Sequence, residues 1–528
     1  MRPMNMKNPI SKTSMLVALM LTLALSFVTA AHAAAPGITG TPSTTGGVAF
    51  SLTAQPAYLN QPDGSSVYSW GYGCATAPAA FLPPMKNASC PTMQVPGPTL
   101  IVTEGQSVTV SLTNNLPTAA GNTSILFPGF TLTSTSGGVA GLLTQEAAPG
   151  ATVSYTFTAS TPGTHSYYSG TQGDLQIEMG LYGALIVLPS NTAAISACGS
   201  GLHAANLTAE SHWGETDWRL ATAAYDHPAT CYDREYLFQF SEMDPNIHAQ
   251  ALAQSTLSCT GCMLVPTEPY HPAYFLINGR SMPDDMDPNY DTPYPHQPYN
   301  GNPHMHAGEQ VLLRIIGQGR WQHPFHEHAN HVRILARDGN LILTPDGAAL
   351  AGAPLFTTTT TPGQTMDGIF YYTGRGLNWD MYAHNPTSTD PNAKLPCTPD
   401  ANGYNTGAPT AINFWEWCAD HNKPLEVAPV GDVPSGGPAT LPNPLILTNG
   451  AWYSGSPYLG QDATTRAVGP NTNLLPSNVQ QNPAGERGFA FMWHSHNERE
   501  ITTNNVFPGG MLMMMLLDSR EFVIDESN

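Results

Sequence analysis

The chain has 528 residues, which is enough for two or three domains that each bury a core. Its formal net charge is −20, only 11% of its residues are charged, and no basic patch interrupts the acidity. Such a chain repels nucleic acid and anionic lipid, so we expect neither as a partner. The 49 glycines and 48 prolines favour an all-β protein with long ordered loops.

Residues 1–33 have the features of a secretory signal peptide. Three basic residues precede an apolar run from Met15 to Ala30, and Ala31-His32-Ala33 matches an A-x-A cleavage site; an uncleaved anchor is the alternative. The leader holds three basic residues and no acidic one, so cleavage would take the net charge from −20 to −23. No later stretch is apolar for long enough to span a bilayer. We therefore expect an exported protein, periplasmic or extracellular, with no membrane span after cleavage.

All eight cysteines follow the leader, and an even number in an exported chain indicates disulfides. Sequence alone does not fix their connectivity. Proximity suggests the pairs Cys74–Cys90, Cys198–Cys231, Cys259–Cys262 and Cys397–Cys418. The Cys-x-x-Cys spacing of the third pair also suits a redox or metal site. A local disulfide is favoured, because no second such pair supplies the partner that a zinc site needs.

Alternating apolar residues predict the first strands of the chain. Ser107–Thr113 and Thr152–Thr158 alternate like half-buried antiparallel strands, and Leu181–Leu188 is a short apolar strand. No amphipathic helical period is sustained here. Residues 40–190 are therefore predicted to form a β-sandwich or barrel, and residues 191–230 a connector to the next domain.

Strand patterns resume in residues 231–528, which we assign to a second domain. They cover Glu235–Phe240, Tyr274–Ile277, Val311–Ile316, His331–Ala336, Ile369–Thr373, Phe489–Trp493 and Gly510–Leu517. Residues from about 385 to 485 are rich in Pro, Asn, Gly and Thr and show little periodicity. We interpret them as a long loop-rich insertion in the second domain.

Two His-x-His pairs, His326/His328 and His494/His496, lie in apolar strand-like contexts. Alternate side chains of a strand point to the same face, so each pair presents two imidazoles on one side. If the two strands are neighbours, four imidazoles meet at one point, which is a ligand shell for copper or zinc. One such pair is weak evidence, and two are much stronger. The segment His304-Met305-His306 is a weaker candidate for Cu(I).

Short motifs follow in a fixed order through both predicted domains. In the first domain they are Val95-Pro96-Gly97-Pro98-Thr99, Glu104-Gly105, Gly141 to Gln145, Pro149-Gly150, Gly163-Thr164 and Gly180 to Val187. In the second they are Ile277-Asn278-Gly279-Arg280, Gly308-Glu309, His323 to His331, Asp338-Gly339, Gly363-Gln364 and the tail from His494 to Met511. In this order they resemble the multicopper oxidases, the laccase-like family built from cupredoxin β-sandwiches.

The resemblance implies tandem cupredoxin-like Greek-key β-sandwiches with copper as cofactor. It also implies an oxidoreductase that takes electrons from a small-molecule or metal-ion reductant, with O₂ as acceptor. The family's first domain gives two His-x-His pairs to a trinuclear copper cluster. Those positions here hold Leu126, Pro128, Tyr168 and Gly170, with His165 close by but out of register. The second domain keeps its half of the cluster as His326, His328, His494 and His496.

The family's electron-accepting type 1 copper needs a cysteine thiolate. Ser495 stands at that position and Glu500 at the position of the second histidine, while His323 and Met511 match the other two ligands. No blue copper site is therefore expected. Further candidate ligands are His323, His331, Glu500 and Met511. Glu500 is also a candidate for orienting imidazole N–H groups, or an ordinary solvated carboxylate. Methionines in an apolar strand more often pack in the core.

The sequence thus predicts an exported multicopper-oxidase-like protein with a type 2-like copper site, and leaves the catalytic residues unassigned. A non-catalytic copper binder or carrier of the cell envelope is the first alternative, and a structural cupredoxin scaffold the second. An oligomer is compatible with the sequence. An identical neighbour would lack the same first-domain ligands, however, and would not complete a trinuclear cluster.

Overall fold

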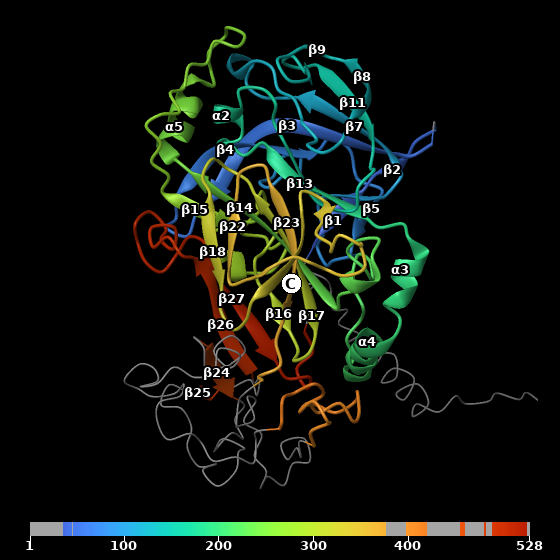
Figure 1. The fold of residues 1–528 in the computed structure, drawn as a ribbon. Coiled ribbons are helices and arrows are strands. Elements are labelled where there is room, and N and C mark those ends of the chain that lie inside the picture. The colour runs from blue at the N-terminus through green and yellow to red at the C-terminus, as the bar shows by residue number, and fades with distance from the viewer. Residues whose placement is uncertain are drawn as a thin grey trace, which may run out of the picture.

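The computed structural model describes residues 35–44, 46–375, 398–419, 455–459, 480–481 and 488–524. The expected signal peptide, Cys397 and most of the expected insertion lie outside these ranges. The described chain is all-β, with few helices, and forms tandem cupredoxin-like sandwiches (Figure 1). Within the described ranges, no helix has the length and apolar character needed to cross a membrane.

The first sandwich has two main sheets, in the upper part of Figure 1. One has the order β12-β13-β6-β1-β5, and the other the order β2-β3-β7-β11-β8 with β4 paired to β3; β9 and β10 form a separate hairpin. The strands are β1 (Gly37–Thr39), β2 (Thr41–Pro42), β3 (Val48–Asn60), β4 (Ser66–Cys74), β5 (Ala80–Leu82), β6 (Leu100–Thr103), β7 (Ser107–Asn114), β8 (Leu132–Gly137), β9 (Val139–Ala140), β10 (Gln145–Glu146), β11 (Thr152–Thr158), β12 (Gly163–Tyr168) and β13 (Tyr182–Leu188). Two short helical turns join them, η1 (Thr118–Ala120) and α2 (Gly173–Gln176).

Strands β7 and β11 show why the alternating pattern folds this way. Their inward side chains pair across the strands, with Val110 opposite Tyr155, and are fully buried. Their outward hydroxyls also pair, as in the 2.7 Å contact between the Oγ atoms of Ser111 and Ser154. One face thus buries apolar surface while the other satisfies its polar groups, which confirms both predicted strands.

The connector is helical and is fastened by the predicted disulfide between Cys198 and Cys231. It contains α3 (Thr192–Ala197), α4 (Gly201–Trp213) and η2 (Pro228–Thr230). The buried face of α4 includes the polar residues Asn206 and Glu210, so hydrophobic periodicity gives little sign of this helix. Cys74–Cys90 and Cys259–Cys262 are also confirmed. Cys418 is disulfide-bonded too, but its predicted partner lies outside the described residues.

The second sandwich fills the lower part of Figure 1, with helix α5 (Pro245–Gln254) beside the first sandwich. One sheet has the order β15-β14-β17-β23-β19-β20 with β21 on β19, and the other the order β16-β27-β26-β18-β22 with β24 on β26 and β25 on β24. The elements are β14 (Arg234–Met243), β15 (Tyr274–Ile277), η3 (Asp284–Met286), β16 (His304–Met305), β17 (Gln310–Gly317), β18 (His323–Glu327), β19 (Val332–Arg337), β20 (Asn340–Leu341), β21 (Pro354–Leu355), β22 (Thr357–Thr360), β23 (Thr365–Tyr371), β24 (Gly455–Leu459), β25 (Gln480–Gln481), β26 (Gly488–Ser495) and β27 (Leu512–Asp518).

The expected insertion does not separate β26 from the rest of the second domain. The chain returns to the sheet so that β26 lies between β27 and β18. Strand β24, which was expected to belong to a stretch without periodic structure, pairs antiparallel with β26 and extends that sheet. The core between the two sheets joins aromatic residues of β14 to those of β26 and methionines of β27, including Phe240, Phe491 and Met513.

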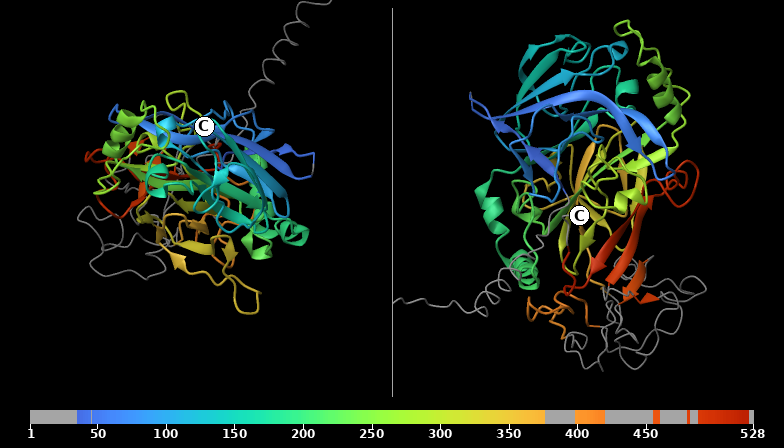
Figure 2. Two further views of the ribbon diagram at one scale, coloured as in Figure 1. Left: turned by 90° about the horizontal axis from the view of Figure 1, so that it is seen from above. Right: turned by 180° about the vertical axis from the view of Figure 1, so that it is seen from behind.

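The two sandwiches meet through buried polar contacts. The Oγ1 of Thr164 in β12 donates a 2.6 Å hydrogen bond to Asp367 in β23, and its backbone N–H donates to the same carboxylate at 3.1 Å. Tyr182 in β13 donates to the Oγ of Ser241 in β14 at 2.7 Å. The view from behind in Figure 2 shows the strands of the first sandwich lying directly over those of the second. A buried carboxylate with three donors is costly to expose, so these contacts fix the relative position of the sandwiches.

Candidate metal centre

The two His-x-His pairs lie on adjacent strands. β18 and β26 pair antiparallel, and His326 is directly opposite His494 in the register. His328 follows the end of β18, and His496 follows the end of β26. The expected adjacency of the two strands is therefore observed.

The four imidazole rings form one cluster. The ring of His326 lies 4.8, 5.2 and 5.7 Å, centroid to centroid, from those of His328, His496 and His494. His494 lies 5.1 Å from His328 and 5.6 Å from His496. His326 and His328 are buried, His494 is half-buried and His496 is exposed, so the cluster has a closed side and an open side.

A backbone carbonyl and a side-chain hydroxyl orient two of the rings. Nδ1 of His494 lies 2.8 Å from the carbonyl oxygen of Ser495, which can only accept, so Nδ1 carries the proton and the Nε2 lone pair faces the cluster. Nδ1 of His326 lies 3.0 Å from the hydroxyl of Thr357, which leaves its Nε2 for a ligand. Histidines that bind metals are commonly held in this way through their other nitrogen.

Burial also favours the neutral form of these rings. It lowers the pKa of His326, and the neighbouring rings of His494 and His496 lower it further. The pKa of His494 is lowered by burial and by His496. Neutral imidazole is the form that coordinates metals, so burial favours the metal-binding form of His326 and His494.

One pair of nitrogens already has the separation that a shared ion requires. The Nε2 atoms of His328 and His494 are 3.3 Å apart. Two ligands at the zinc–imidazole distance of about 2.0 Å, at a tetrahedral angle, would lie about 3.3 Å apart. Among the described residues, however, the one triplet of candidate ligand atoms all within 4.8 Å of one another is elsewhere, at Glu215, His306 and Glu309. His326 and His496 must therefore rotate to bring their nitrogens to the same point.

The position that the family resemblance assigns to type 1 copper is filled by an ion cluster. Nε2 of His323 lies 3.0 Å from Glu242 and Nδ1 lies 2.9 Å from Glu500, and these side chains are at most 1% exposed. Ser495, at the thiolate position, donates a 2.6 Å hydrogen bond to Glu500. Burial alone would lower the pKa of His323, but its hydrogen bonds to the two carboxylates raise it to about 9. His323 and Glu500 thus belong to this sealed cluster and not to the group of four histidines.

The other candidate ligands also lie in different surroundings. Met511 is fully buried in the apolar core of the second sandwich, as expected for a methionine in a strand context. The ring of His331 contacts Phe356 edge-on, at 5.2 Å between centroids. Met511 thus packs in the core, while the ring of Phe356 contacts both His331 and, from the four-histidine group, His326.

Apolar packing occupies the first-domain positions that the resemblance assigns to copper ligands. Leu126 forms a β-bridge with Tyr168, and a Cβ atom on Gly170 would lie 2.8 Å from the side chain of Leu126. His165 is buried, with Nε2 2.9 Å from the carbonyl of Thr161. Its pKa is lowered by burial. None of the four assigned positions therefore carries an imidazole, and the neighbouring His165 is hydrogen-bonded through Nε2 to the carbonyl of Thr161.

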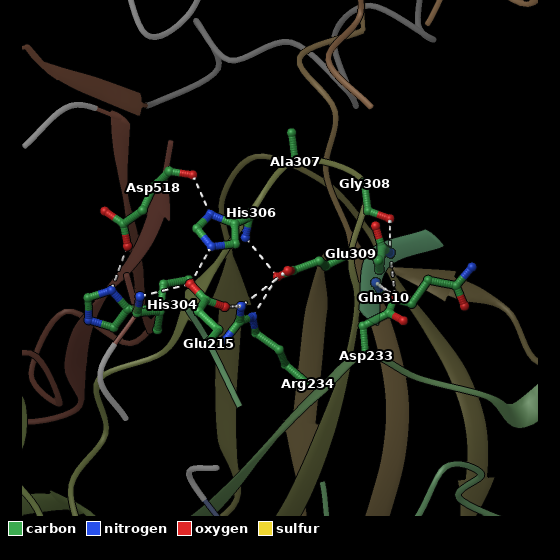
Figure 3. Close-up of polar contacts among 12 residues, drawn as sticks. Glu215, Asp233, Arg234, His304, His306, Ala307, Gly308, Glu309, Gln310 and Asp518 are labelled. Atoms are coloured by element: carbon green, nitrogen blue, oxygen red, sulfur yellow. Dashed lines mark hydrogen bonds and ion pairs between the residues drawn. The ribbon is translucent and has the colours of Figure 1, made fainter. Parts of the chain in front are cut away.

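The His304-Met305-His306 segment belongs to a buried ion-pair network (Figure 3). Nε2 of His306 lies 2.8 Å from Glu215, and Nδ1 of His304 lies 2.7 Å from Asp518. Arg234 pairs with Glu215 and, at 2.6 Å, with Glu309. The guanidinium already supplies a cation, and every oxygen of the two glutamates accepts a hydrogen bond. This triplet is therefore a structural ion-pair network, and the Cu(I) hypothesis for the segment finds no support there.

Sequence reasoning missed three residues that shape the centre. Thr357 holds His326, Glu242 holds His323, and Phe356 lies against the ring of His326 at 5.8 Å between centroids. Thr357 follows Phe356 in a threonine-rich run whose β-propensity was a usable signal. Glu242 comes from the opposite sheet, and nothing in its local sequence connects it to His323.

Comparisons with known proteins give one family match, and its residues lie in the first sandwich and the start of the connector. The multicopper oxidase family model matches residues 83–192. This part of the chain is thus similar to the multicopper oxidases. A multicopper oxidase of Talaromyces pinophilus is 38% identical over 98 residues, covering 18% of this chain and 15% of that protein. An L-ascorbate oxidase of Brassica rapa subsp. pekinensis is 38% identical over 96 residues, covering 18% and 16%.

The matched stretches are short. They span only 15 to 21% of the length of the curated relatives. Among solved structures, the blue copper oxidase of Nitrosomonas europaea matches with a TM-score of 0.44 and 16% identity, covering 88% of this chain and 85% of that one. Another multicopper oxidase matches with a TM-score of 0.43 and 16% identity, covering 89% and 85%. Multicopper oxidases use copper. This chain has two imidazole pairs in its second sandwich, and the first-sandwich positions that the resemblance assigns to copper ligands hold Leu126, Pro128, Tyr168 and Gly170.

Proposed function

We propose that this chain is an exported copper-binding oxidoreductase whose single copper is held by His326, His328, His494 and His496. The observation that carries the proposal is the direct pairing of His326 with His494, which gathers four imidazoles into one cluster. Four neutral nitrogen ligands suit a type 2-like copper, and a bound copper would supply one-electron redox chemistry. The chain's own residues bind the ion, hold the rings through Thr357 and Ser495, and bury one side of the cluster.

The surroundings of the cluster support a mononuclear site. The first-domain ligand positions hold apolar side chains, and the type 1 position holds the ion cluster of Glu242, His323 and Glu500. The three described disulfides are consistent with an oxidising compartment, either periplasmic or extracellular. A small-molecule or metal-ion reductant, with O₂ as acceptor, follows from the family.

The second candidate is a non-catalytic copper binder. It is favoured by one specific observation, the replacement of the thiolate by Ser495 and the sealing of the adjacent His323 by carboxylates. Without a type 1 copper to accept electrons first, an electron must reach the copper at the four histidines directly. Oxygen consumption with phenolic, Mn(II) or Cu(I) donors separates the two candidates.

Metal analysis and electron paramagnetic resonance test the shared claim. The protein is expected to bind about one copper per chain, with a type 2 signal and no intense blue absorption. The double variant His326→Gln/His494→Gln keeps side chains of similar size, and copper content should fall to background. His212→Gln, at an exposed position of helix α4, is the matched control and should bind as the parent does. If the double variant binds as much copper as the parent, the copper site lies elsewhere in the protein.

A further inference from the structure

One of the three described disulfides lies at the surface of the molecule. Cys259 is exposed and its partner Cys262 is half-buried. In each of the other two pairs, at least one cysteine is no more than 5% exposed. Thiol–disulfide exchange begins when a thiolate reaches a disulfide sulfur, so the accessibility of the sulfur limits the reaction. Cys259–Cys262 is therefore the described disulfide that an external thiol reaches most easily.

The loop that carries this disulfide is held in place by other contacts. It follows helix α5 and lies at the upper edge of the molecule in Figure 1. The side-chain amide of Gln254 joins its two ends, because it accepts a 2.8 Å hydrogen bond from the N–H of Leu264 and donates one of 2.8 Å to the carbonyl of the same residue. The N–H groups of Gly261 and Met263 donate to two carbonyls of η1 in the first sandwich, at 3.0 and 2.9 Å. None of these contacts involves sulfur, so reduction leaves the two cysteines close together and able to pair again.

This disulfide also closes a very small loop. The sequence separation of its cysteines is 3, compared with 16 and 33 for the other two pairs. The entropy that a cross-link removes from the unfolded chain grows with the size of the loop that it closes. By this mechanism the pair stabilises the fold least, and a chemical role accounts for it better than a structural one.

The two cysteines of the pair have different surroundings. Cys262 packs against the apolar core of the first sandwich, and the next residue, Met263, is buried in that core. Cys259 is exposed instead. An approaching thiolate therefore meets the sulfur of Cys259 first, and Cys262 is the leaving group.

Exposed leucines flank the disulfide on both sides along the chain. Leu257 is 43% exposed and Leu264 is 81% exposed. Each lies two residues from a cysteine of the pair, within about 7 Å along the backbone. No Asp, Glu, Lys or Arg occurs from residue 245 to residue 267, although the chain has a net charge of −20. The surface beside the disulfide thus offers apolar contact without charge repulsion.

We propose that Cys259–Cys262 is a thiol–disulfide exchange site, reduced by a dithiol protein that has apolar side chains beside its cysteines. The inference is independent of the proposed copper site. A thiolate of the partner bonds to Sγ of Cys259, the Cys259–Cys262 bond breaks, and the thiolate of Cys262 leaves. The partner's second thiolate then attacks the partner sulfur of the mixed disulfide and releases Cys259. Two electrons and the two thiol protons pass to this chain, and the partner ends as a disulfide.

Differential alkylation with mass spectrometry tests the site in the intact folded chain. Dithiothreitol should reduce Cys259–Cys262 at least about ten-fold faster than the other two described pairs, because a buried sulfur must first be exposed by local opening. A synthetic peptide with one thiol, quenched with acid after brief reaction, should be found bonded to Cys259. Equal rates for the three pairs, or an adduct found at Cys262, overturns the proposal.

A second comparison identifies the kind of reductant. The probe is a synthetic Cys-x-x-Cys peptide with phenylalanine and leucine beside its cysteines. Leu264→Ser should slow reduction by this peptide about three- to ten-fold, the loss expected for a leucine half-buried in the complex, and should leave reduction by dithiothreitol unchanged. Leu142→Ser, at a 92% exposed leucine between β9 and β10, is the matched control and should change neither rate. Equal peptide rates for Leu264→Ser and the parent overturn the protein partner in favour of small thiols.

The double variant Cys259→Ser/Cys262→Ser tests whether the fold needs this disulfide. It should unfold in urea as cooperatively as the parent, because the hydrogen bonds of Gln254 and of the loop to η1 remain. Loss of the folded state would show a structural disulfide and overturn the proposal. Failure of the copper site would leave all these rates unchanged, so the two proposals are tested separately.

Discussion

The sealed cluster of His323, Glu242 and Glu500 predicts that the protein loses stability at alkaline pH. The pKa of His323 is raised to about 9, from an ordinary value of 6.5, by hydrogen bonds to the two carboxylates. This difference corresponds to about 3 kcal/mol of stabilisation of the charged ring in the folded state. Because the folded pKa is the higher one, the stabilisation is complete below about pH 6.5 and is lost as the pH rises through 9.

The substitution His323→Gln isolates this contribution. Glutamine can donate one hydrogen bond but does not titrate, and it leaves a buried carboxylate without its cation, which costs about 3–5 kcal/mol. Urea unfolding of the wild type and the variant should be measured between pH 6 and pH 10. Their difference in the free energy of unfolding should shrink by about 3 kcal/mol across this range. Groups that titrate elsewhere, such as Glu327, cancel in the difference.

A direct titration supplies an independent check. Carbon-13 labelled histidine, assigned by comparison with His323→Gln, should show one ring that stays protonated well above pH 7. His212→Gln, at an exposed histidine, should leave the stability difference flat. A wild-type minus His323→Gln difference that is constant from pH 6 to pH 10 would refute the claim that the carboxylates hold a charged ring.

Three further predictions follow from described contacts. Ser495→Cys supplies the missing thiolate but should give no intense blue absorption, because the histidine beside it is held by two carboxylates; visible spectroscopy of the copper-loaded variant decides this. Removing the disulfide through Cys198→Ala/Cys231→Ala opens a loop with a sequence separation of 33 and should cost about 4 kcal/mol in urea unfolding. Thr164→Val removes the 2.6 Å hydrogen bond to Asp367 between the sandwiches and should cost about 1.5 to 3 kcal/mol; a cost below 0.5 kcal/mol would contradict its role there.

Periodicity predicted strands well where one face is buried and the other is polar. β7 and β11 match the expected Ser107–Thr113 and Thr152–Thr158 almost residue for residue. Strand β14 runs further than the expected Glu235–Phe240, because all its residues are buried and its polar ones are satisfied inside the protein. Helix α4 gave little signal, since part of its buried face is polar. An alternating pattern therefore predicts a strand when one face is apolar and the other polar. It gives no signal when both faces have the same character.

The alternation of side chains along a strand also explains which parts of the candidate site were predictable. His326 lies in β18 and His328 follows directly after the strand, and adjacency to β26 needed only the sheet order. Strand parity also places His323 on the opposite face from His326, because the two are three residues apart. That inference was open from the sequence and would have removed His323 from the list of ligands. Glu242 could not be found in this way, since it reaches His323 from the other sheet.

Strands β18 and β26 therefore carry two different chemistries on their two faces. The inner face holds His323 and Ser495, whose contacts are buried ion pairs and hydrogen bonds with Glu500. The outer face holds the cluster that includes His326 and His494. If the backbone register of a strand is unchanged, a substitution on one face has little effect on the side chains of the other face. Inner-face substitutions should consequently shift the stability curve and leave copper stoichiometry unchanged, while outer-face substitutions should abolish copper binding at small cost in stability. A variant of Glu500 that lost copper without losing stability would contradict this separation.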